Sequence, residues 1–138
     1  MRITLGEWRH LGDARVESTG RLALPTPPTG PGLYRFLLSG SSHSVYVGET
    51  EDLPRRFYGY RNPGPSQRTN QRMNQRMLDV LAAGGRVAIE VCTGAVIEVG
   101  TCHEPLDLRV KSHRLLAEEG ALAAARAEGL GTVENAGG

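Results

Sequence analysis

Two short apolar segments separated by a polar turn constrain the fold of this chain more than any other feature. Residues 32–38 (GLYRFLL) and 45–48 (VYVG) are rich in the residue types that favour strands, and residues 39–44 (SGSSHS) supply a polar turn. Two strands joined by so short a loop pair antiparallel, so the pattern predicts a β-hairpin. Period-two alternation then places Tyr34 and Phe36 on the same face of the first strand.

Two helices are predicted directly after this hairpin. Asp52 or Thr50 can cap the first helix, and Pro54 suits its first turn. The breaker sequence NPGP at residues 62–65 ends that helix. A second helix is predicted over residues 69–83, where apolar residues recur at helical spacing before a Gly-Gly pair.

The C-terminal half continues with strands and a long helix. Residues 87–92 and 95–99 are typical of strands, joined either as a two-residue hairpin or as one long strand with a bulge. A helical pattern runs from about residue 106 to residue 127. A short extended tail is expected over residues 132–135, and residues 136–138 are expected to fray.

The order of these elements predicts an α+β fold. Strands and helices mix without regular βαβ alternation, so we expect a small, largely antiparallel β-sheet flanked by helices. Residues 31–138 would form this domain, and residues 1–30 an N-terminal extension packed on it. Within the extension, residues 1–5 predict a short strand and residues 7–16 a helical turn or two.

Length and composition restrict the class of protein. The chain has 138 residues, which suits one domain, and a formal net charge of +1, which by itself gives no case for nucleic-acid binding. No apolar run approaches the roughly 18 residues of a membrane span, and the first residues lack the apolar stretch of a signal peptide. Cys92 and Cys102 lack the spacing of a zinc site. We expect a cytoplasmic protein that does not contact membranes.

An ordered set of residues runs through the hairpin and the first helix. GLY stands at residues 32–34, and YVG follows after an interval of eleven residues at 46–48. Arg56 lies ten residues after the first residue of YVG, and Tyr60 lies four residues later. This order and its strand–hairpin–helix setting resemble the signature of the GIY-YIG nuclease superfamily, over roughly residues 31–138. The combined pattern is far more specific than either tripeptide.

The resemblance also implies a fold, a metal ligand and a cofactor. It implies the GIY-YIG-like fold, in which a glutamate on a later helix binds a divalent metal. Glu119 is the best match to that glutamate, and Asn135 matches an asparagine that commonly follows it. The implied cofactor is Mg²⁺ or Mn²⁺. Mg²⁺ often uses only one or two carboxylates and keeps several waters, so one glutamate is a chemically reasonable ligand.

The implied catalytic set comprises five residues with distinct roles. Tyr34 would be the candidate base that accepts a proton from water, with Tyr46 as its helper and Tyr60 beside them. The ordinary tyrosine pKa near 10 is too high for a good base, so a nearby metal and Arg56 are expected to lower it. Arg56 would grip the scissile phosphate. Glu119 would hold the metal next to the leaving 3′ oxygen.

Some assignments have neighbouring alternatives. Arg55 could replace Arg56, Tyr58 could replace Tyr60, and Glu118 could replace Glu119. Asn135 could be an ordinary turn residue. The spacing implied by the resemblance favours Arg56, and Tyr60 is favoured because positions four apart share a helix face. Glu119, with Leu122 three residues later, matches the Glu-x-x-apolar pattern of the family.

Glu49 departs from the family pattern. Many repair-type members carry a lysine at this position, three residues after the second signature tyrosine. A carboxylate acts in the opposite electrostatic sense near a phosphate. Glu49 therefore motivates an alternative function without catalysis.

Arginines are concentrated after the hairpin. Residues 54–78 contain six arginines and neither Asp nor Glu, so the near-neutral total conceals a basic stretch. We predict that, beside Arg56, five of them track the phosphate backbone of a nucleic acid. These are Arg55, Arg61, Arg68, Arg72 and Arg76. The competing interpretation is a pair of solvated helix faces.

Together these features predict a metal-dependent endonuclease that hydrolyses DNA phosphodiester bonds by a single-metal mechanism with tyrosine-assisted water activation. The alternative is a catalytically inactive nucleic-acid-binding module or regulator that keeps the GIY-YIG fold. RNA is a third substrate hypothesis. The sequence specifies neither the DNA site recognised nor whether the protein is a monomer or a dimer.

Overall fold

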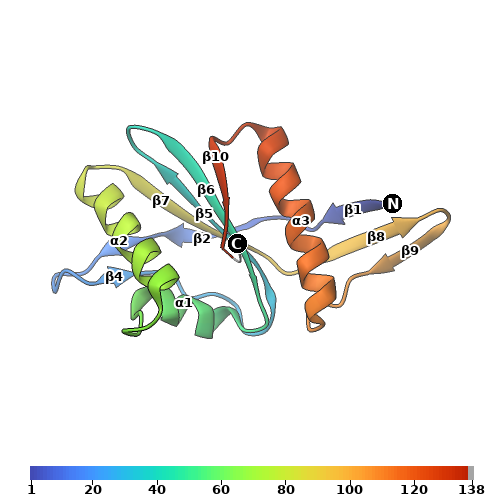
Figure 1. Ribbon diagram of the computed structural model, residues 1–138, viewed down its shortest axis with the longest axis horizontal. Coiled ribbons are helices and arrows are strands. Elements are labelled where there is room, and N and C mark those ends of the chain that lie inside the picture. Colours follow the sequence, from blue (N-terminus) through green and yellow to red (C-terminus); the bar gives the residue numbers. More distant parts are fainter. Residues whose placement is uncertain (137–138) are drawn as a thin grey trace.

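The computed structural model describes residues 1–136. Helices and strands alternate irregularly along this part of the chain (Figure 1). The elements in order are β1 (Arg2–Leu5), β2 (Arg9–Asp13), β3 (Arg15–Val16), β4 (Leu22–Ala23), β5 (Gly32–Ser39), β6 (His43–Thr50), α1 (Leu53–Arg61), α2 (Arg68–Ala82), β7 (Arg86–Cys92), β8 (Ala95–Val99), β9 (Cys102–Pro105), α3 (Lys111–Glu128) and β10 (Thr132–Asn135).

The predicted hairpin lies at the centre of the main sheet. β5 and β6 pair antiparallel from Gly32 opposite Thr50 to Ser39 opposite His43, which confirms the hairpin. β7 pairs antiparallel with the other edge of β5, β2 pairs with β7, and β10 pairs parallel with β6. The resulting strand order among the described residues is β10-β6-β5-β7-β2. β5 is therefore the middle strand, and most of its side chains are buried.

The chain leaves this sheet after β7, and the next strand, β8, belongs to a smaller sheet. β8 pairs antiparallel with β1 on one side and with β9 on the other. This small sheet projects beyond α3 (Figure 1). The amide of Gly6 donates to the carbonyl of Gly94 over 2.8 Å, at the junction between β7 and β8. The strands predicted at residues 87–92 and 95–99 are therefore confirmed, but both ways of joining them are wrong. They form no hairpin, because each strand pairs with other partners, and they form no single long strand, because they belong to different sheets.

The N-terminal residues form strands. The strand predicted at residues 1–5 is confirmed as β1. The helical turn predicted at residues 7–16 is wrong, because β2 pairs with the free edge of β7, with a shift of register just before Gly12. Non-local pairing satisfies the backbone there, and short sequences of mixed propensity follow such context. The division into an extension over 1–30 and a domain over 31–138 stays a prediction.

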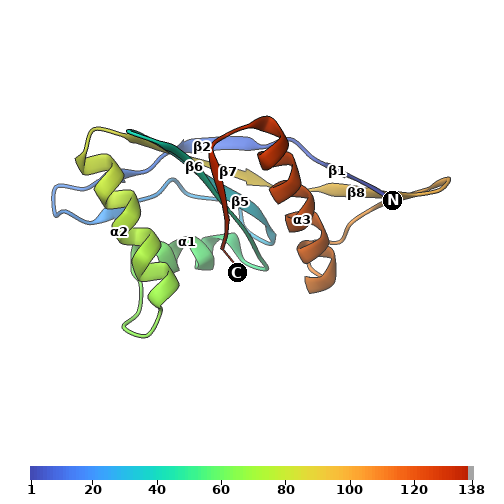
Figure 2. The same ribbon diagram turned by 45° about the horizontal axis from the view of Figure 1, so that its top comes forward.

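Helices cover both faces of the central sheet (Figure 2). α1 and α2 pack on the face that carries Tyr34 and Phe36, with Met77 of α2 fully buried there. α3 packs on the opposite face, where Ala121 lies among buried residues that include Leu33. This separation confirms the α+β class and the alternation predicted for the first strand of the hairpin.

The long C-terminal helix starts later than the sequence indicates. α3 begins at Lys111 rather than near residue 106, because the chain first pairs as β9 and then turns, with the Arg109 amide donating to Asp107 Oδ1 over 3.0 Å. It ends at Gly129, which adopts the left-handed conformation at φ +67°. In the described part of the chain, no helix combines the length and hydropathy needed to cross a bilayer.

The tail returns to the central sheet. The segment 132–135, predicted to be extended, is β10 and pairs with β6. Ala136 is buried, and its amide donates to the carbonyl of Val47 over 2.8 Å, so its predicted fraying is wrong. Residues 137 and 138, which share that prediction, lie outside the described residues.

Candidate active site

Tyr34 on β5 and Tyr46 on β6 lie on the same face of the central sheet. The register places Tyr34 opposite Gly48 and Phe36 opposite Tyr46, and residues opposite one another in antiparallel strands share a face. A Cβ at Gly48 would overlap Cζ and the hydroxyl of Tyr34 and stand 2.8 Å from Cβ of Ala136. The glycine of YVG therefore makes room for the tyrosine of GLY.

Helix α1 brings two further candidates to this face. Its cap is the predicted one, because the Asp52 side chain accepts from the amide of Arg55 over 3.1 Å and Pro54 occupies the first turn. Arg56 and Tyr60 are four residues apart and therefore share one helix face. The Arg56 guanidinium lies 4.7 Å from the centroid of the Tyr60 ring.

A chain of hydrogen bonds joins four of the predicted site residues. Arg56 Nε donates to the Tyr34 hydroxyl over 2.9 Å. The Tyr34 and Tyr60 hydroxyls lie 2.7 Å apart, and the Tyr60 hydroxyl donates to that of Tyr46 over 3.3 Å. All three tyrosines are buried. The structure thus brings Tyr34, Tyr46, Arg56 and Tyr60 together.

The buried tyrosines resist ionisation. Burial raises the pKa of Tyr34 to about 12, and the charge of Arg56 offsets only part of this effect. Burial also raises the pKa of Tyr60, and the neighbouring Tyr34 and Tyr46 add to the rise. Arg56 lowers the Tyr34 pKa as expected, but lost hydration outweighs this attraction in the protein by itself, and the expected effect of a metal stays a prediction.

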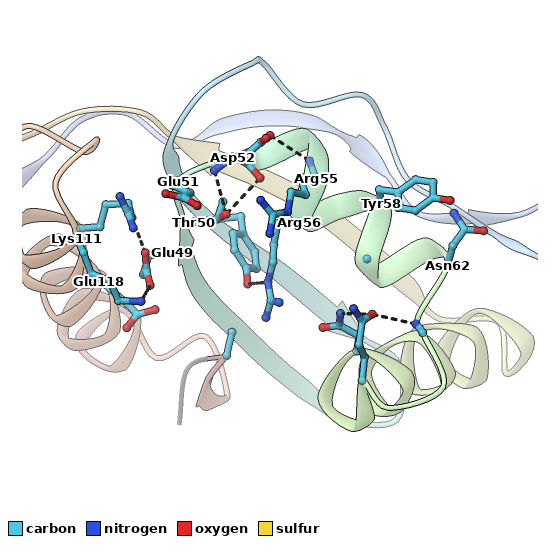
Figure 3. Close-up of a pocket in the computed structure, with 17 residues that line it drawn as sticks. Glu49, Thr50, Glu51, Asp52, Arg55, Arg56, Tyr58, Asn62, Lys111 and Glu118 are labelled. Atoms are coloured by element: carbon cyan, nitrogen blue, oxygen red, sulfur yellow. Dashed lines mark hydrogen bonds and ion pairs between the residues drawn. The ribbon is translucent and has the colours of Figure 1, made fainter.

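A pocket of about 730 Å³ opens over Tyr34 and Arg56 (Figure 3). Its walls come from the end of β6, from α1, from the start of α2 and from α3. Figure 3 shows Lys111 and Glu118 on one side, Tyr58 on the other, and Arg56 between them. Charged and polar side chains dominate this lining, which suits an ionic ligand better than an apolar one.

Glu118, and not Glu119, lines this pocket. Glu118 is 4% exposed, whereas Glu119 is exposed on another face of α3 and is not among the described residues that line the pocket. One carboxylate oxygen of Glu118, Oε2, is buried and has no hydrogen-bond partner among residues 1–136. Burial, followed by the charge of Glu49, raises the Glu118 pKa above 4.5. The geometry therefore favours the alternative, Glu118, over Glu119 as the carboxylate that faces the pocket, and the metal-binding role of either residue stays a prediction.

Glu49 is paired with two cations of α3. Arg114 Nε donates to Glu49 Oε2 over 2.6 Å, and Lys111 Nζ lies 3.5 Å from Oε1. Arg114 is almost fully buried, and Lys111 is exposed at the edge of the pocket. These contacts offset the negative charge that makes Glu49 unusual at its position.

The residues present fit a divalent cation that keeps most of its waters. Within the described residues, no cluster of three or more His, Cys, Asp or Glu side chains could hold a metal ion. Glu118 nevertheless offers an unpartnered carboxylate oxygen in a polar pocket, and Mg²⁺ is commonly bound through one or two carboxylates plus water. Glu118 is therefore the residue that could hold Mg²⁺ or Mn²⁺.

Four of the predicted nucleic-acid-binding arginines are exposed, namely Arg55, Arg61, Arg68 and Arg72. Arg55 is exposed on α1 and lines the pocket. Arg68 and Arg72 are exposed on α2, and Arg72 also lines a second pocket of about 250 Å³ together with Tyr46. These side chains lie where a backbone phosphate could reach them, and their role stays a prediction.

Two arginines of the same set make contacts within the protein. Arg76 pairs with Glu134 of β10, and its Nη2 donates to Ser44 Oγ over 2.7 Å. Arg61 lies over the ring of Tyr58, 5.7 Å from its centroid. Arg76 thus differs from the more exposed arginines of the set, because its contacts connect α2 to the edge of the sheet.

Asn135, at the end of β10, contacts Glu118. It is partly buried near the end of β10, and its side chain hydrogen bonds the carboxylate of Glu118, which opposes the rise in the Glu118 pKa. It also lines the second pocket with Tyr46. Its proposed membership of the site stays a prediction.

Comparison with known proteins identifies a structural neighbour. No model of a known protein family matches the sequence, and no curated protein matches it significantly. Among solved structures, the fold is similar to that of a mutant of EndoII from bacteriophage T4. The TM-score is 0.56 over 81% of this chain and 86% of that chain, at 13% identity. Such a likeness shows the fold alone, and it agrees with the predicted GIY-YIG-like architecture.

The sequence contained a usable signal for Glu118. Ala121 and Leu122 follow Glu118 by three and four residues, so helical periodicity places Glu118 on the apolar face of α3. Glu119 lies about 100° further round the helix. By contrast, no local pattern indicated that Arg114 and Lys111 would meet Glu49, because 65 residues separate Glu49 from Arg114.

Proposed function

We propose that this protein is a metal-dependent endonuclease of the GIY-YIG type that hydrolyses DNA phosphodiester bonds. The observation that carries the proposal is the hydrogen bond from Arg56 to Tyr34, in a pocket that Glu118 also lines. Guanidinium, phenol and carboxylate are the groups needed to bind a phosphate, move a proton and hold a cation. The fold shared with EndoII, a nuclease of the GIY-YIG family, supports a nuclease.

Arg56 binds the scissile phosphate in this proposal. Its Nε donates to Tyr34, and its Nη groups have no hydrogen-bond partner among residues 1–136. Two Nη donors held in a fixed plane can bind two phosphate oxygens and stabilise the charge that grows on them during attack. The bond to Tyr34 and the contact with the Tyr60 ring orient the guanidinium before substrate arrives.

Tyr34 moves the proton of the attacking water. Because burial raises its pKa to about 12, a standing phenolate is a minor species at neutral pH. Tyr34 instead accepts the water proton as it passes its own proton to the Tyr60 hydroxyl, 2.7 Å away. Tyr60 passes a proton to the Tyr46 hydroxyl, 3.3 Å away, and Tyr46 releases its own proton to water in the second pocket, which it lines. The proton thus leaves the first pocket without a stable anion among the three rings.

Glu118 holds the cation, and Asn135 orients its carboxylate. A bound Mg²⁺ or Mn²⁺ supplies charge stabilisation at the scissile phosphate and at the leaving oxygen. Metal binding requires the ionised carboxylate, and the raised pKa of Glu118 makes this step sensitive to pH.

The pairing of Glu49 favours the enzyme over the catalytically inactive binding module. The module hypothesis has two motives, the negative charge of Glu49 beside the phosphate site and the open choice of metal-binding glutamate, and the contacts of Glu49 bear on the first. Arg114 and Lys111 offset that charge from two sides, so it opposes phosphate binding less than an isolated carboxylate would.

The test is cleavage of supercoiled plasmid and of branched DNA by the purified protein with Mg²⁺, Mn²⁺ or EDTA. We expect metal-dependent nicking that falls at least about 100-fold in Arg56→Ala and in Glu118→Gln. Glu119→Gln is the matched control and should cleave like the wild type. A single-stranded RNA of the same sequence serves as the competing substrate.

Two outcomes would contradict the proposal. Cleavage that survives both Arg56→Ala and Glu118→Gln would show that another site performs it. Salt-dependent DNA binding without cleavage under either metal would support the inactive module instead.

A further inference from the structure

Tyr58 differs from the other three tyrosines of the chain. It is 59% exposed, whereas Tyr34, Tyr46 and Tyr60 are buried in the hydroxyl chain. It nevertheless lines the same pocket as Tyr34 and Arg56. Neither phosphate binding nor proton transfer uses it. An aromatic ring at the mouth of a charged pocket is therefore available for a different contact.

The Tyr58 ring is held in place from one side. Arg61 follows it by three residues on α1, and its guanidinium lies 5.7 Å from the ring centroid. A cation beside an aromatic ring is attracted to its electron-rich face. The ring therefore has a supported orientation and keeps more than half of its surface in contact with solvent.

The pocket wall next to Tyr58 is polar, and hydrogen bonds within the turn between α1 and α2 stabilise it. Asn62 and Gln67 line the pocket there, in the turn between α1 and α2. Gln67 Oε1 accepts from the amide of Gly64 over 2.9 Å, and Gln71 Nε2 donates to the Gly64 carbonyl over 2.6 Å. Side-chain amides of this kind can donate to and accept from the edge of a base.

Figure 3 places this corner at a distance from the proposed metal ligand. Tyr58 and Asn62 lie on the side of the pocket formed by α1, and Glu118 lies on the opposite side, on α3. Arg56 lies between them. A nucleotide whose phosphate binds Arg56 therefore has an aromatic ring within the same pocket on one side and the carboxylate on the other.

We propose that Tyr58 is a stacking site for a nucleobase next to the phosphate held by Arg56. This inference rests on the proposed function, since it presumes a nucleic-acid substrate. In a duplex, both faces of every internal base are covered by neighbouring bases, so Tyr58 can stack only on a base outside the helical stack. The preferred substrate is therefore DNA with an unpaired or displaced base beside the cut, such as a flap, gap or branch.

The test measures binding in EDTA, so that it does not depend on cleavage. The probes are two DNA duplexes, one fully paired and one with a single unpaired 2-aminopurine, whose fluorescence falls on stacking. For the unpaired probe we expect Tyr58→Ala to bind about 5- to 150-fold more weakly than the wild type and to lose the quenching. Tyr58→Phe should retain both. Leu115→Ala, at an exposed apolar residue of α3, is the control.

Three results would overturn the inference. Equal binding of the unpaired probe by Tyr58→Ala and the wild type would show that the ring makes no contact. Equal loss in Tyr58→Phe would assign the effect to the hydroxyl. An equal loss with the fully paired duplex would show that no displaced base is involved. Quenching that depends on Tyr58 in a protein that never cleaves would uphold the stacking site and contradict the nuclease.

Discussion

Arg114 on α3 donates a hydrogen bond from Nε to Oε2 of Glu49, at the end of β6, over 2.6 Å. Its Nη1 also donates to the carbonyls of Leu108 and Arg109, over 3.0 and 3.1 Å. Both charged side chains are largely buried, so this ion pair fastens the third helix to the hairpin beside the pocket. A buried pair of this kind is costly to break, because the remaining charge loses its partner.

We therefore expect Arg114→Ala to lower the free energy of unfolding by about 3 kcal/mol, since Glu49 would face Glu118 without its main partner. Urea denaturation measures this change. Lys111→Ala removes the weaker and exposed partner of Glu49 and should cost less than about 1 kcal/mol. Equal stability of Arg114→Ala and the wild type would contradict the importance of the pair.

Replacement of Glu118 should separate stability from activity. Its folded-state pKa is raised above 4.5, first by burial and then by Glu49, so the folded protein holds this proton more tightly than the unfolded chain. The stability that this tighter proton binding gives the folded wild-type protein is fully present below the pKa of the unfolded state. It is lost as the pH rises through the pKa of the folded state. At pH 7, the free energy of unfolding of Glu118→Gln should therefore exceed that of the wild type by on the order of 1 kcal/mol. The same substitution should abolish cleavage.

Thermal unfolding at pH 4 and pH 7 checks this expectation. The stability gained by Glu118→Gln should shrink at the lower pH, where the wild-type carboxyl is protonated. Glu119→Gln should change neither stability nor cleavage, because its side chain is exposed. A Glu118→Gln protein less stable than the wild type at pH 7 would refute the electrostatic explanation.

Tyr60→Phe should interrupt proton transfer while the aromatic packing remains. The substitution removes the hydroxyl that lies between those of Tyr34 and Tyr46. We expect single-turnover cleavage about 100-fold slower, in the range of a missing proton-transfer group, with DNA binding unchanged. Cleavage at the wild-type rate would show that the proton leaves Tyr34 by another route.

Gly48→Ala should disturb the site through packing alone. The added methyl group would overlap the hydroxyl end of Tyr34, and both positions are buried in the sheet. Overpacking of this kind costs about 1–3 kcal/mol and should move Tyr34 away from Arg56. Cleavage and denaturation curves measure the two effects. Gly94→Ala is the matched control, because a Cβ there meets nothing within 4 Å.

The exposed arginines should determine the salt dependence of DNA binding. Arg68→Ala and Arg72→Ala should each reduce the slope of log K against log salt by about 0.7–0.9 for each phosphate that the variant no longer neutralises. Fluorescence anisotropy at several salt concentrations measures the slope. Arg76→Ala should change the slope least, because Arg76 already pairs with Glu134. Equal slopes in all three variants would remove the case for a phosphate track on α2.

Local patterns sufficed for the hairpin and the first helix. Alternating apolar residues with a short polar turn define β5 and β6, and Asp52 with Pro54 defines the start of α1. Once these elements form, the positions of Tyr34 and Arg56 follow from period two along a strand and from one helical turn. Their meeting could therefore be expected from the order of residues along the chain, while their roles remain predictions.

Sequence by itself failed where the partner lies far along the chain. Residues 7–16 are short and carry mixed propensities, so their conformation depends on the strand edge they meet. Residues 95–99 form the predicted strand, but they pair with β1 and β9 and not with residues 87–92. Likewise, nothing adjacent to Glu49 indicates Arg114, which reaches it from α3.

The amino-acid sequence alone determined the α+β class and the order of hairpin, helices and candidate residues, because these depend on interactions between near neighbours. The tertiary structure showed which of Glu118 and Glu119 lines the pocket, since the packing of α3 against the sheet turns one carboxylate into the pocket and the other to solvent. It also determined how strongly the Tyr34 hydroxyl holds its proton. Burial by elements from distant parts of the chain sets its pKa, and no local pattern contains that desolvation.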